Sequence, residues 1–293
     1  MSDILLRGSS MDGAIRVFVA VTTDLVNEAQ KIHKTYSTAT AALGRALTIS
    51  AIIGAGMKNE TDSTTIQWKG DGPLGSIVCV CNNKSEVRGY VVNPYVDIPR
   101  KENGKLDVGA AVGKGFLNVI RDLGLKEPYA GQVPIVTGEI AEDMTYYFAA
   151  SEQIPTAIAL GVLVNPDSSV KCAGGFMIQL MPEASEAVAE ELEEKMKTLP
   201  PITTMIEDGM SAEDILFTVC DGFDMLMENK TVTPRYKCQC SKQRMEKALI
   251  SIGKKELEDL ISEQGSAEIC CQFCDNKYTF DKNALEKLLE EAK

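Results

Sequence analysis

Four cysteines near the C-terminus constrain this chain more than any other feature of its sequence. They form two pairs, Cys238-Gln239-Cys240 and Cys271-Gln272-Phe273-Cys274, with thirty residues between them. Four sulfur donors on two tight turns match the ligand number and softness of a tetrahedral zinc site. The pattern therefore predicts one Zn²⁺ per chain held by four ligands: Cys238, Cys240, Cys271 and Cys274. Two structural disulfides are the alternative interpretation.

The net charge of −12 argues against nucleic acid as the main partner, because phosphate binding needs a basic surface. At the N-terminus, an apolar run of three residues stops at Arg7, so no signal peptide is predicted. Residues 39–57 have the length of a membrane span, but they include Arg45 and several small polar residues. We expect a buried core helix there, a cytoplasmic protein and no membrane partner.

Five further cysteines lie outside the two pairs. In a cytoplasmic chain they are more plausibly reduced than disulfide-bonded. Cys172 and Cys220 stand singly in apolar surroundings, which predicts inert core residues. Cys79 and Cys81 fall on one face of a predicted strand, where either core packing or a second redox pair is possible. Cys270 directly precedes Cys271, and we prefer Cys271 as the ligand because its spacing to Cys274 forms the usual knuckle.

Residues 1–180 predict an α+β core domain with a largely antiparallel sheet, because adjacent strands are interrupted by segregated helices. Asp24 resembles the N-cap of the first helix. The predicted helices cover 24–33, 38–57 and 140–151. The predicted strands cover 14–23, 64–69, 76–81, 86–92, 115–120, 132–137, 156–164 and 173–181.

Residues 181–232, here called the acidic segment, differ from the rest of the chain in charge. They contain thirteen acidic side chains against three lysines, a net charge of −10. Pro200-Pro201, Gly209 and Gly222 divide the segment into short amphipathic pieces, one of them opened by a capping box at Ser211. Such short helices need a packing partner, and their like charges repel. The segment is either an ordinary helical connector or a metastable linker.

Residues 233–293 carry the zinc site in a small C-terminal domain. Ser241 and Asp281 are predicted helix N-caps, and strands are predicted on either side of the second cysteine pair. About sixty residues with few large apolar side chains are too few to depend on a hydrophobic core alone. The metal is therefore expected to stabilise this domain.

The sequence offers no catalytic residues, and we expect the protein not to be an enzyme. His33 is the only histidine, so histidine-based triads and H-E-x-x-H metalloproteases are excluded. Its position at a predicted helix end favours a solvent-facing side chain. The glycine pairs at Gly54 and Gly113 lack the third glycine of a dinucleotide-binding fingerprint.

The cysteine spacing, the acidic segment and the α+β core together resemble the heat shock protein 33 family of redox-regulated cytoplasmic chaperones. The similarity runs from end to end of the chain. Besides the four thiols, family patterns match at AALGR (41–45), GDGPLG (70–75), VRGY (87–90) and SEQ (151–153).

The resemblance implies an ATP-independent holdase that binds unfolded client proteins during oxidative stress. Such a chaperone is inactive when reduced and zinc-bound, and it is activated when oxidation forms disulfides, releases zinc and unfolds the linker. The implied disulfides are Cys238–Cys240 and Cys271–Cys274, and homodimers are implied in the activated state. Cys270 departs from the family pattern and leaves the oxidised pairing open.

Two other classes of function are compatible with paired cysteines. A zinc-ribbon nucleic-acid module needs basic flanks, whereas residues 233–293 carry eleven charges of each sign. A thiol-disulfide oxidoreductase needs a C-x-x-C in a thioredoxin-like βαβ setting, which the sequence lacks.

Overall fold

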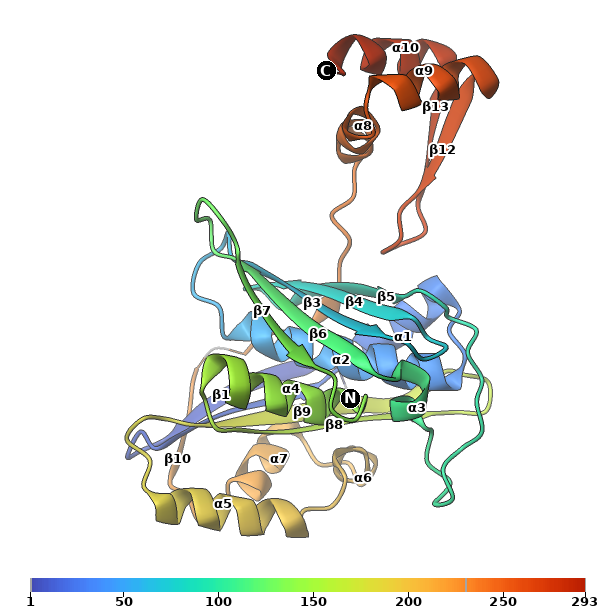
Figure 1. Cartoon of the computed structure of the whole chain (residues 1–293). Coiled ribbons are helices and arrows are strands. Elements are labelled where there is room, and N and C mark those ends of the chain that lie inside the picture. The colour runs from blue at the N-terminus through green and yellow to red at the C-terminus, as the bar shows by residue number, and fades with distance from the viewer. Residues whose placement is uncertain (1, 230, 293) are drawn as a thin grey trace. The chain divides into compact units, whose positions relative to one another are not determined.

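The computed structural model describes residues 2–229 and 231–292. The chain divides into two compact units between Lys237 and Cys238 (Figure 1). The first unit contains two sheets with helices between them, and the second contains three helices and a hairpin. This mixed architecture with antiparallel pairing confirms the predicted α+β class.

Sheet A has five strands, and every pairing in it is antiparallel. Its strand order is β10 (Met225–Met227), β1 (Ile4–Ser10), β2 (Ile15–Val21), β9 (Val170–Leu180) and β8 (Thr156–Val164). The two strands at one edge, β1 and β10, were not predicted from the sequence. The short strand β10 brings the end of the acidic segment onto this sheet.

Sheet B has six strands and is antiparallel except at one edge. Its strand order is β11 (Arg235–Tyr236), β5 (Glu86–Val91), β4 (Ser76–Asn82), β3 (Ser63–Gly70), β6 (Gly115–Asp122) and β7 (Tyr129–Pro134). The exception is β11, which pairs with β5 in parallel and was not predicted.

Helix α2 (Ser37–Ala55) lies between the two sheets and forms the centre of the core (Figure 1). Small residues on α2 allow strand β4 to approach the helix closely. A Cβ added at Gly54 would lie 2.4 Å from a backbone oxygen of β4. Among the described residues, α2 is the one helix long and apolar enough to cross a bilayer, and 94% of its most apolar 18-residue stretch is buried inside the protein. The prediction of a buried core helix is confirmed.

The remaining helices of this core are short. They are α1 (Thr23–His33), α3 (Val108–Val112) and α4 (Ile140–Tyr147), the last continued by a π-helical turn at Phe148–Glu152. The predicted N-cap of α1 was wrong, because Asp24 lies in the first turn. Asp3 instead accepts hydrogen bonds from the backbone N–H groups of Asp24 (2.9 Å) and Leu25 (2.7 Å). A residue distant in sequence thus caps this helix.

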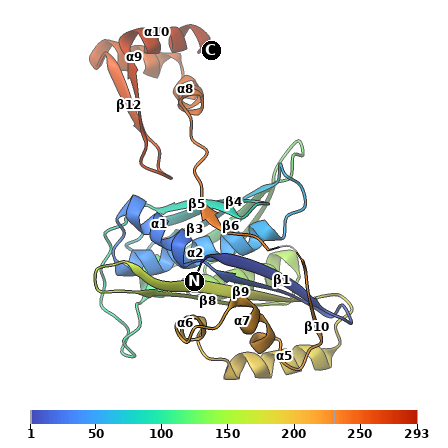
Figure 2. The ribbon, with the colours of Figure 1, turned by 180° about the vertical axis from the view of Figure 1, so that it is seen from behind.

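The acidic segment packs its helices against the face of sheet A that points away from α2 (Figure 2). These helices are α5 (Glu186–Thr198), α6 (Ile202–Glu207) and α7 (Ala212–Val219). Ile202, Met205, Ile215 and Leu216 from the segment form one buried cluster with Phe176 and its neighbours on the sheet. The acidic side chains lie on the opposite, solvent-facing side of these amphipathic helices.

The second unit is built from small elements. They are α8 (Lys242–Ser251), α9 (Lys254–Glu263), the hairpin of β12 (Ser266–Cys270) and β13 (Lys277–Asp281), and α10 (Lys282–Glu291). Ser241 and Asp281 cap α8 and α10 with their side-chain oxygens, as predicted. The buried apolar cluster of this unit consists of Leu249, Leu257, Phe280, Leu285 and Leu288.

We predict that Gly89→Ala destabilises the first unit by about 1–3 kcal/mol, because there is no space for a side chain at this position. The added Cβ would lie 2.7 Å from Cys79 Sγ and 3.1 Å from Leu47 Cδ2. Trp68, the only tryptophan, is fully buried in β3 and reports unfolding of this unit by its fluorescence in urea. Lys84→Ala, in the exposed turn before β5, serves as the control. An unchanged urea midpoint for Gly89→Ala would contradict the packing argument.

Candidate metal centre

The four cysteines of the two pairs converge in the second unit. We call Cys238, Cys240, Cys271 and Cys274 the four-cysteine cluster; their sulfur atoms all lie within 4.8 Å of one another. The distance from Cys238 Sγ to Cys271 Sγ is 3.7 Å, and that from Cys240 Sγ to Cys274 Sγ is 3.4 Å. A tetrahedron with Zn–S bonds of about 2.3 Å has sulfur–sulfur edges of about 3.8 Å. The cluster could hold a metal ion, and its dimensions fit zinc.

Local backbone structure places the second pair of thiols on one side of a tight turn. The carbonyl oxygen of Cys271 accepts hydrogen bonds from the N–H groups of Cys274 (3.2 Å) and Asp275 (2.8 Å). The N–H of Cys271 donates to Asn276 O at 2.9 Å, which closes the turn. Asp275 adopts a left-handed conformation with φ of 57°. Aspartate tolerates this region better than most residues.

The first pair is organised by its own backbone. The N–H of Cys240 lies 3.4 Å from Cys238 Sγ, a geometry that favours a negatively charged sulfur at Cys238. Ser241 follows at once, and its hydroxyl caps α8 by accepting a hydrogen bond from Arg244 N. The helix start therefore fixes the direction of the chain directly after the second thiol of this pair.

The electrostatics of the cluster favour a cation once its thiols are ionised. Burial opposes ionisation of Cys240, but a hydrogen bond from the Tyr278 hydroxyl, 3.1 Å away, and contacts with the other thiols lower its pKa to about 7. Burial raises the pKa of Cys238 and also that of Cys274. One thiolate is thus accessible near neutral pH, whereas four thiolates this close require a compensating positive charge.

Tyr278 contacts the four-cysteine cluster, and the sequence did not reveal this contact. Its position on a strand next to the second knuckle was predicted, but its hydroxyl contact with Cys240 depends on how the two pairs meet. Hydrogen bonds to ligating atoms orient them and tune their basicity. Tyr278 therefore belongs to the cluster as a positioning residue.

The other five cysteines lie outside the cluster. Cys79 and Cys81 are buried in β4, and burial raises the pKa of both thiols, that of Cys81 to about 12. Burial likewise raises the pKa of Cys172 and that of Cys220, so both are poorly reactive in this fold, as predicted. Cys270 is exposed on β12, whereas its neighbour Cys271 is buried within the cluster.

His33 does not face solvent, and that prediction was wrong. Its side chain is buried at the last turn of α1, and its Nε2 lies 3.0 Å from the hydroxyl of Tyr236 on β11. The aromatic rings meet edge to face, with centroids 6.2 Å apart. The partner is remote in sequence, which is why the local pattern at the helix end gave the wrong environment.

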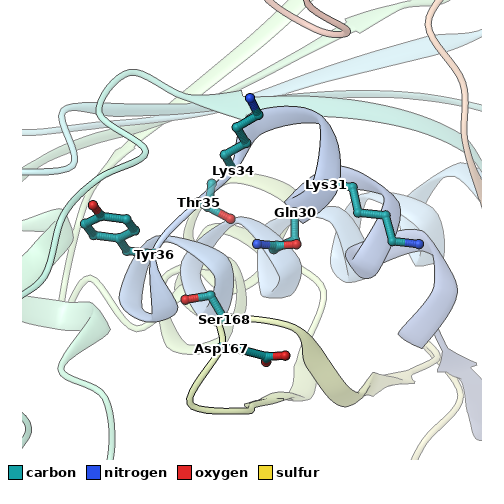
Figure 3. A pocket seen from close by; sticks show the side chains of 7 residues that line it. All are labelled: Gln30, Lys31, Lys34, Thr35, Tyr36, Asp167 and Ser168. Carbon is teal, nitrogen blue, oxygen red and sulfur yellow. The ribbon is translucent and has the colours of Figure 1, made fainter.

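The first unit also has a surface hollow of about 400 Å³ (Figure 3). It is lined by Gln30, Lys31, Lys34, Thr35, Tyr36, Asp167 and Ser168. These seven residues include neither a thiol nor an imidazole, and we assign the hollow no catalytic role.

Comparison with known proteins identifies the family of this chain and agrees with its fold. The family described as Hsp33 protein matches residues 3–281. The chain belongs to the Hsp33 family. It is 47% identical over 294 residues to the 33 kDa chaperonin of Clostridium beijerinckii, with 100% of both chains covered. It is 49% identical over 292 residues to the 33 kDa chaperonin of Clostridioides difficile, with 99% of this chain and 100% of the relative covered.

A solved Hsp33 structure gives the same result at the level of the fold. The crystal structure of the 33 kDa chaperonin from Thermotoga maritima has a TM-score of 0.91 and 38% sequence identity to this chain. The match covers 99% of each chain. Membership of a chaperone family is therefore established, and it agrees with the resemblance seen in the sequence.

We predict that Tyr278→Phe weakens zinc binding about 10-fold, because the variant loses the hydrogen bond that lowers the pKa of Cys240. Protons then compete better for this thiolate, so the pH at which half of the zinc is lost moves upward. A chromophoric chelator titrated against the reduced protein measures both quantities. Tyr95→Phe, at an exposed site in the first unit, is the control. Equal affinities of Tyr278→Phe and the unsubstituted protein would contradict this role.

Proposed function

We propose that this protein is a redox-regulated, ATP-independent holdase that binds unfolding proteins in the cytoplasm under oxidative stress. The four-cysteine cluster carries the proposal, because it combines a metal-binding donor set with oxidisable thiols. In the reduced state the four cysteines would ligate one Zn²⁺, which links the two knuckles when bound. Membership of the Hsp33 family supports the chaperone activity.

Oxidation converts ligands into groups that no longer bind metal. Two thiols lose two protons and two electrons to hydrogen peroxide, which is reduced to two waters as one disulfide forms. We propose the pairs Cys238–Cys240 and Cys271–Cys274, on the strength of the family resemblance. The sulfur distances alone do not select a pairing, because all four atoms lie within 4.8 Å.

The loss of ligands removes most of the stabilisation of residues 233–293. A structural zinc site contributes about 10–16 kcal/mol of apparent binding free energy, whereas whole domains are stable by only about 5–15 kcal/mol. The proposed disulfides close short loops within each knuckle, so they cannot replace a link between the knuckles. The buried apolar cluster around Phe280 is too small to replace the stabilisation lost with the zinc.

The acidic segment is the proposed metastable linker that responds to this loss. It carries a net charge of −10 but few compensating contacts, such as the ion pairs Lys195–Asp221 (3.0 Å) and Lys171–Glu207. Its helices cover apolar residues of sheet A, and a groove of about 410 Å³ runs between α5 and β8. Opening of the segment would uncover this surface for unfolded clients. Activated homodimers are part of the same proposal.

Zinc and light-scattering measurements test the proposal together. Peroxide treatment should release one zinc per chain and reduce far-UV helicity, while the emission of Trp68 stays that of a buried tryptophan. The treated protein should suppress aggregation of a thermally unfolding client, and the reduced protein should not. Suppression of aggregation with zinc still bound would contradict the mechanism.

Adjacent cysteines provide a matched pair of variants. We predict that Cys271→Ser abolishes zinc binding and gives a protein that suppresses aggregation without peroxide, because one ligand of the cluster is lost. Cys270→Ser should bind zinc and respond to peroxide like the unsubstituted protein, since Cys270 is exposed outside the cluster. Colorimetric zinc determination and light scattering distinguish the two. Loss of zinc from Cys270→Ser instead would reverse the assignment.

A further inference from the structure

The last strand before the cysteine cluster occupies the edge of sheet B. Strand β11 is only two residues long, and it pairs with β5 in parallel. The N–H of Arg235 donates to Ser85 O (3.2 Å), and the N–H of Lys237 donates to Val87 O (2.8 Å). Residues 85 and 87 thus direct their carbonyl groups away from β4, toward the position of an added strand.

The next residue of β5 whose backbone groups face this edge is Gly89. Its N–H and C=O groups form hydrogen bonds with a side chain and not with a strand. The Tyr236 hydroxyl donates to Gly89 O at 2.8 Å and accepts from Gly89 N at 3.3 Å. In a longer parallel strand, two backbone residues, one on either side of the residue paired with Gly89, would take these bonds. The hydroxyl therefore covers backbone groups that an extended peptide could pair with.

The surroundings of this edge select a particular kind of peptide. The ring of Tyr236 packs against the main core and meets the ring of His33. Lys237 forms an ion pair with Glu86 at 2.6 Å, and this hydrogen bond, with the nearby Arg235, lowers the pKa of Glu86. An aromatic residue flanked by basic residues in an extended chain is the sequence that the edge now holds.

The position of β11 makes it releasable. It ends at Tyr236, two residues before Cys238, so it directly adjoins the part of the chain whose folding the proposed function makes metal-dependent. Two residues of parallel pairing give little stability of their own. An edge strand with unpaired backbone groups is a ready template for pairing with another chain.

We infer that the edge of β5 is a strand-addition site for clients, kept closed by residues 235–237 in the reduced protein. The ligand is an extended segment of an unfolded protein that carries an aromatic residue between basic residues. Backbone hydrogen bonds to residues 85–89 would provide affinity. The site beside His33 and Glu86 would provide the preference for an aromatic residue next to a basic one. This inference rests on the proposed function, because release of β11 follows from loss of the metal.

A peptide copy of the chain's own segment tests the site. A fluorescein-labelled peptide of residues 232–237, Val-Thr-Pro-Arg-Tyr-Lys, is titrated against the full-length protein, reduced and peroxide-treated, with anisotropy as the readout. We expect the oxidised protein to bind at least 10-fold more tightly. A peptide N-methylated at the lysine that corresponds to Lys237 should bind at least 10-fold more weakly, because it loses the bond to Val87 O. Bound peptide should also slow hydrogen exchange in residues 86–91.

Two protein variants separate this inference from the proposed function. Tyr236→Ala should admit the peptide in the reduced, metal-loaded protein, and Glu86→Gln should weaken binding several-fold in the oxidised protein. If oxidised protein suppresses aggregation but does not bind the peptide, or binds the N-methylated peptide equally well, the inference is overturned and the holdase proposal stands. Dimers that exclude the peptide also overturn it. If oxidised protein does not suppress aggregation, the holdase proposal fails. Binding of the peptide to reduced Tyr236→Ala then decides by itself whether the edge of β5 accepts a strand.

Discussion

The convergence of four sulfur atoms on two knuckles is the interaction on which the proposed function depends. These residues bring together segments more than thirty positions apart, and the hydrophobic cluster around Phe280 is small. Burial and mutual proximity work against ionisation of several thiols at once, so a cation is the natural partner of this donor set. The same thiolates are the groups that oxidants attack most readily. In the proposed function, the stability of the second unit and its sensitivity to oxidants therefore reside in the same atoms.

The first unit has a buried central helix, α2, and an acidic segment that covers one face of sheet A. Helix α2 is almost entirely buried between the sheets, and its small residues bring β4 close. The acidic segment covers sheet A with apolar side chains, yet its outer surface carries most of the net charge of the protein. Repulsion between like charges on these short helices lowers the free energy of unfolding of the acidic segment. The proposed function assigns opening to this segment, which hides apolar surface of sheet A.

Much of this arrangement could be predicted from the sequence because the determining signals are local. The helices of the acidic segment and the caps at Ser211, Ser241 and Asp281 follow from short patterns. Features that depend on remote partners were missed. Asp3, which precedes β1, caps α1 from about twenty positions away, and β11 pairs with β5 across almost 150 positions. His33 was misjudged for the same reason, since its partner Tyr236 is 203 residues away.

Hydrogen exchange of the acidic segment tests the central claim most directly. The full-length protein is compared in its reduced, zinc-loaded state and after peroxide treatment, with exchange resolved for residues 186–198, 202–207 and 212–219. The account predicts that these helices exchange much faster once the zinc is lost, while the buried residues of α2 stay protected. If the C-terminal unit loses its zinc and its protection while the three acidic helices remain as protected as before, the metal site does not control the covering of sheet A.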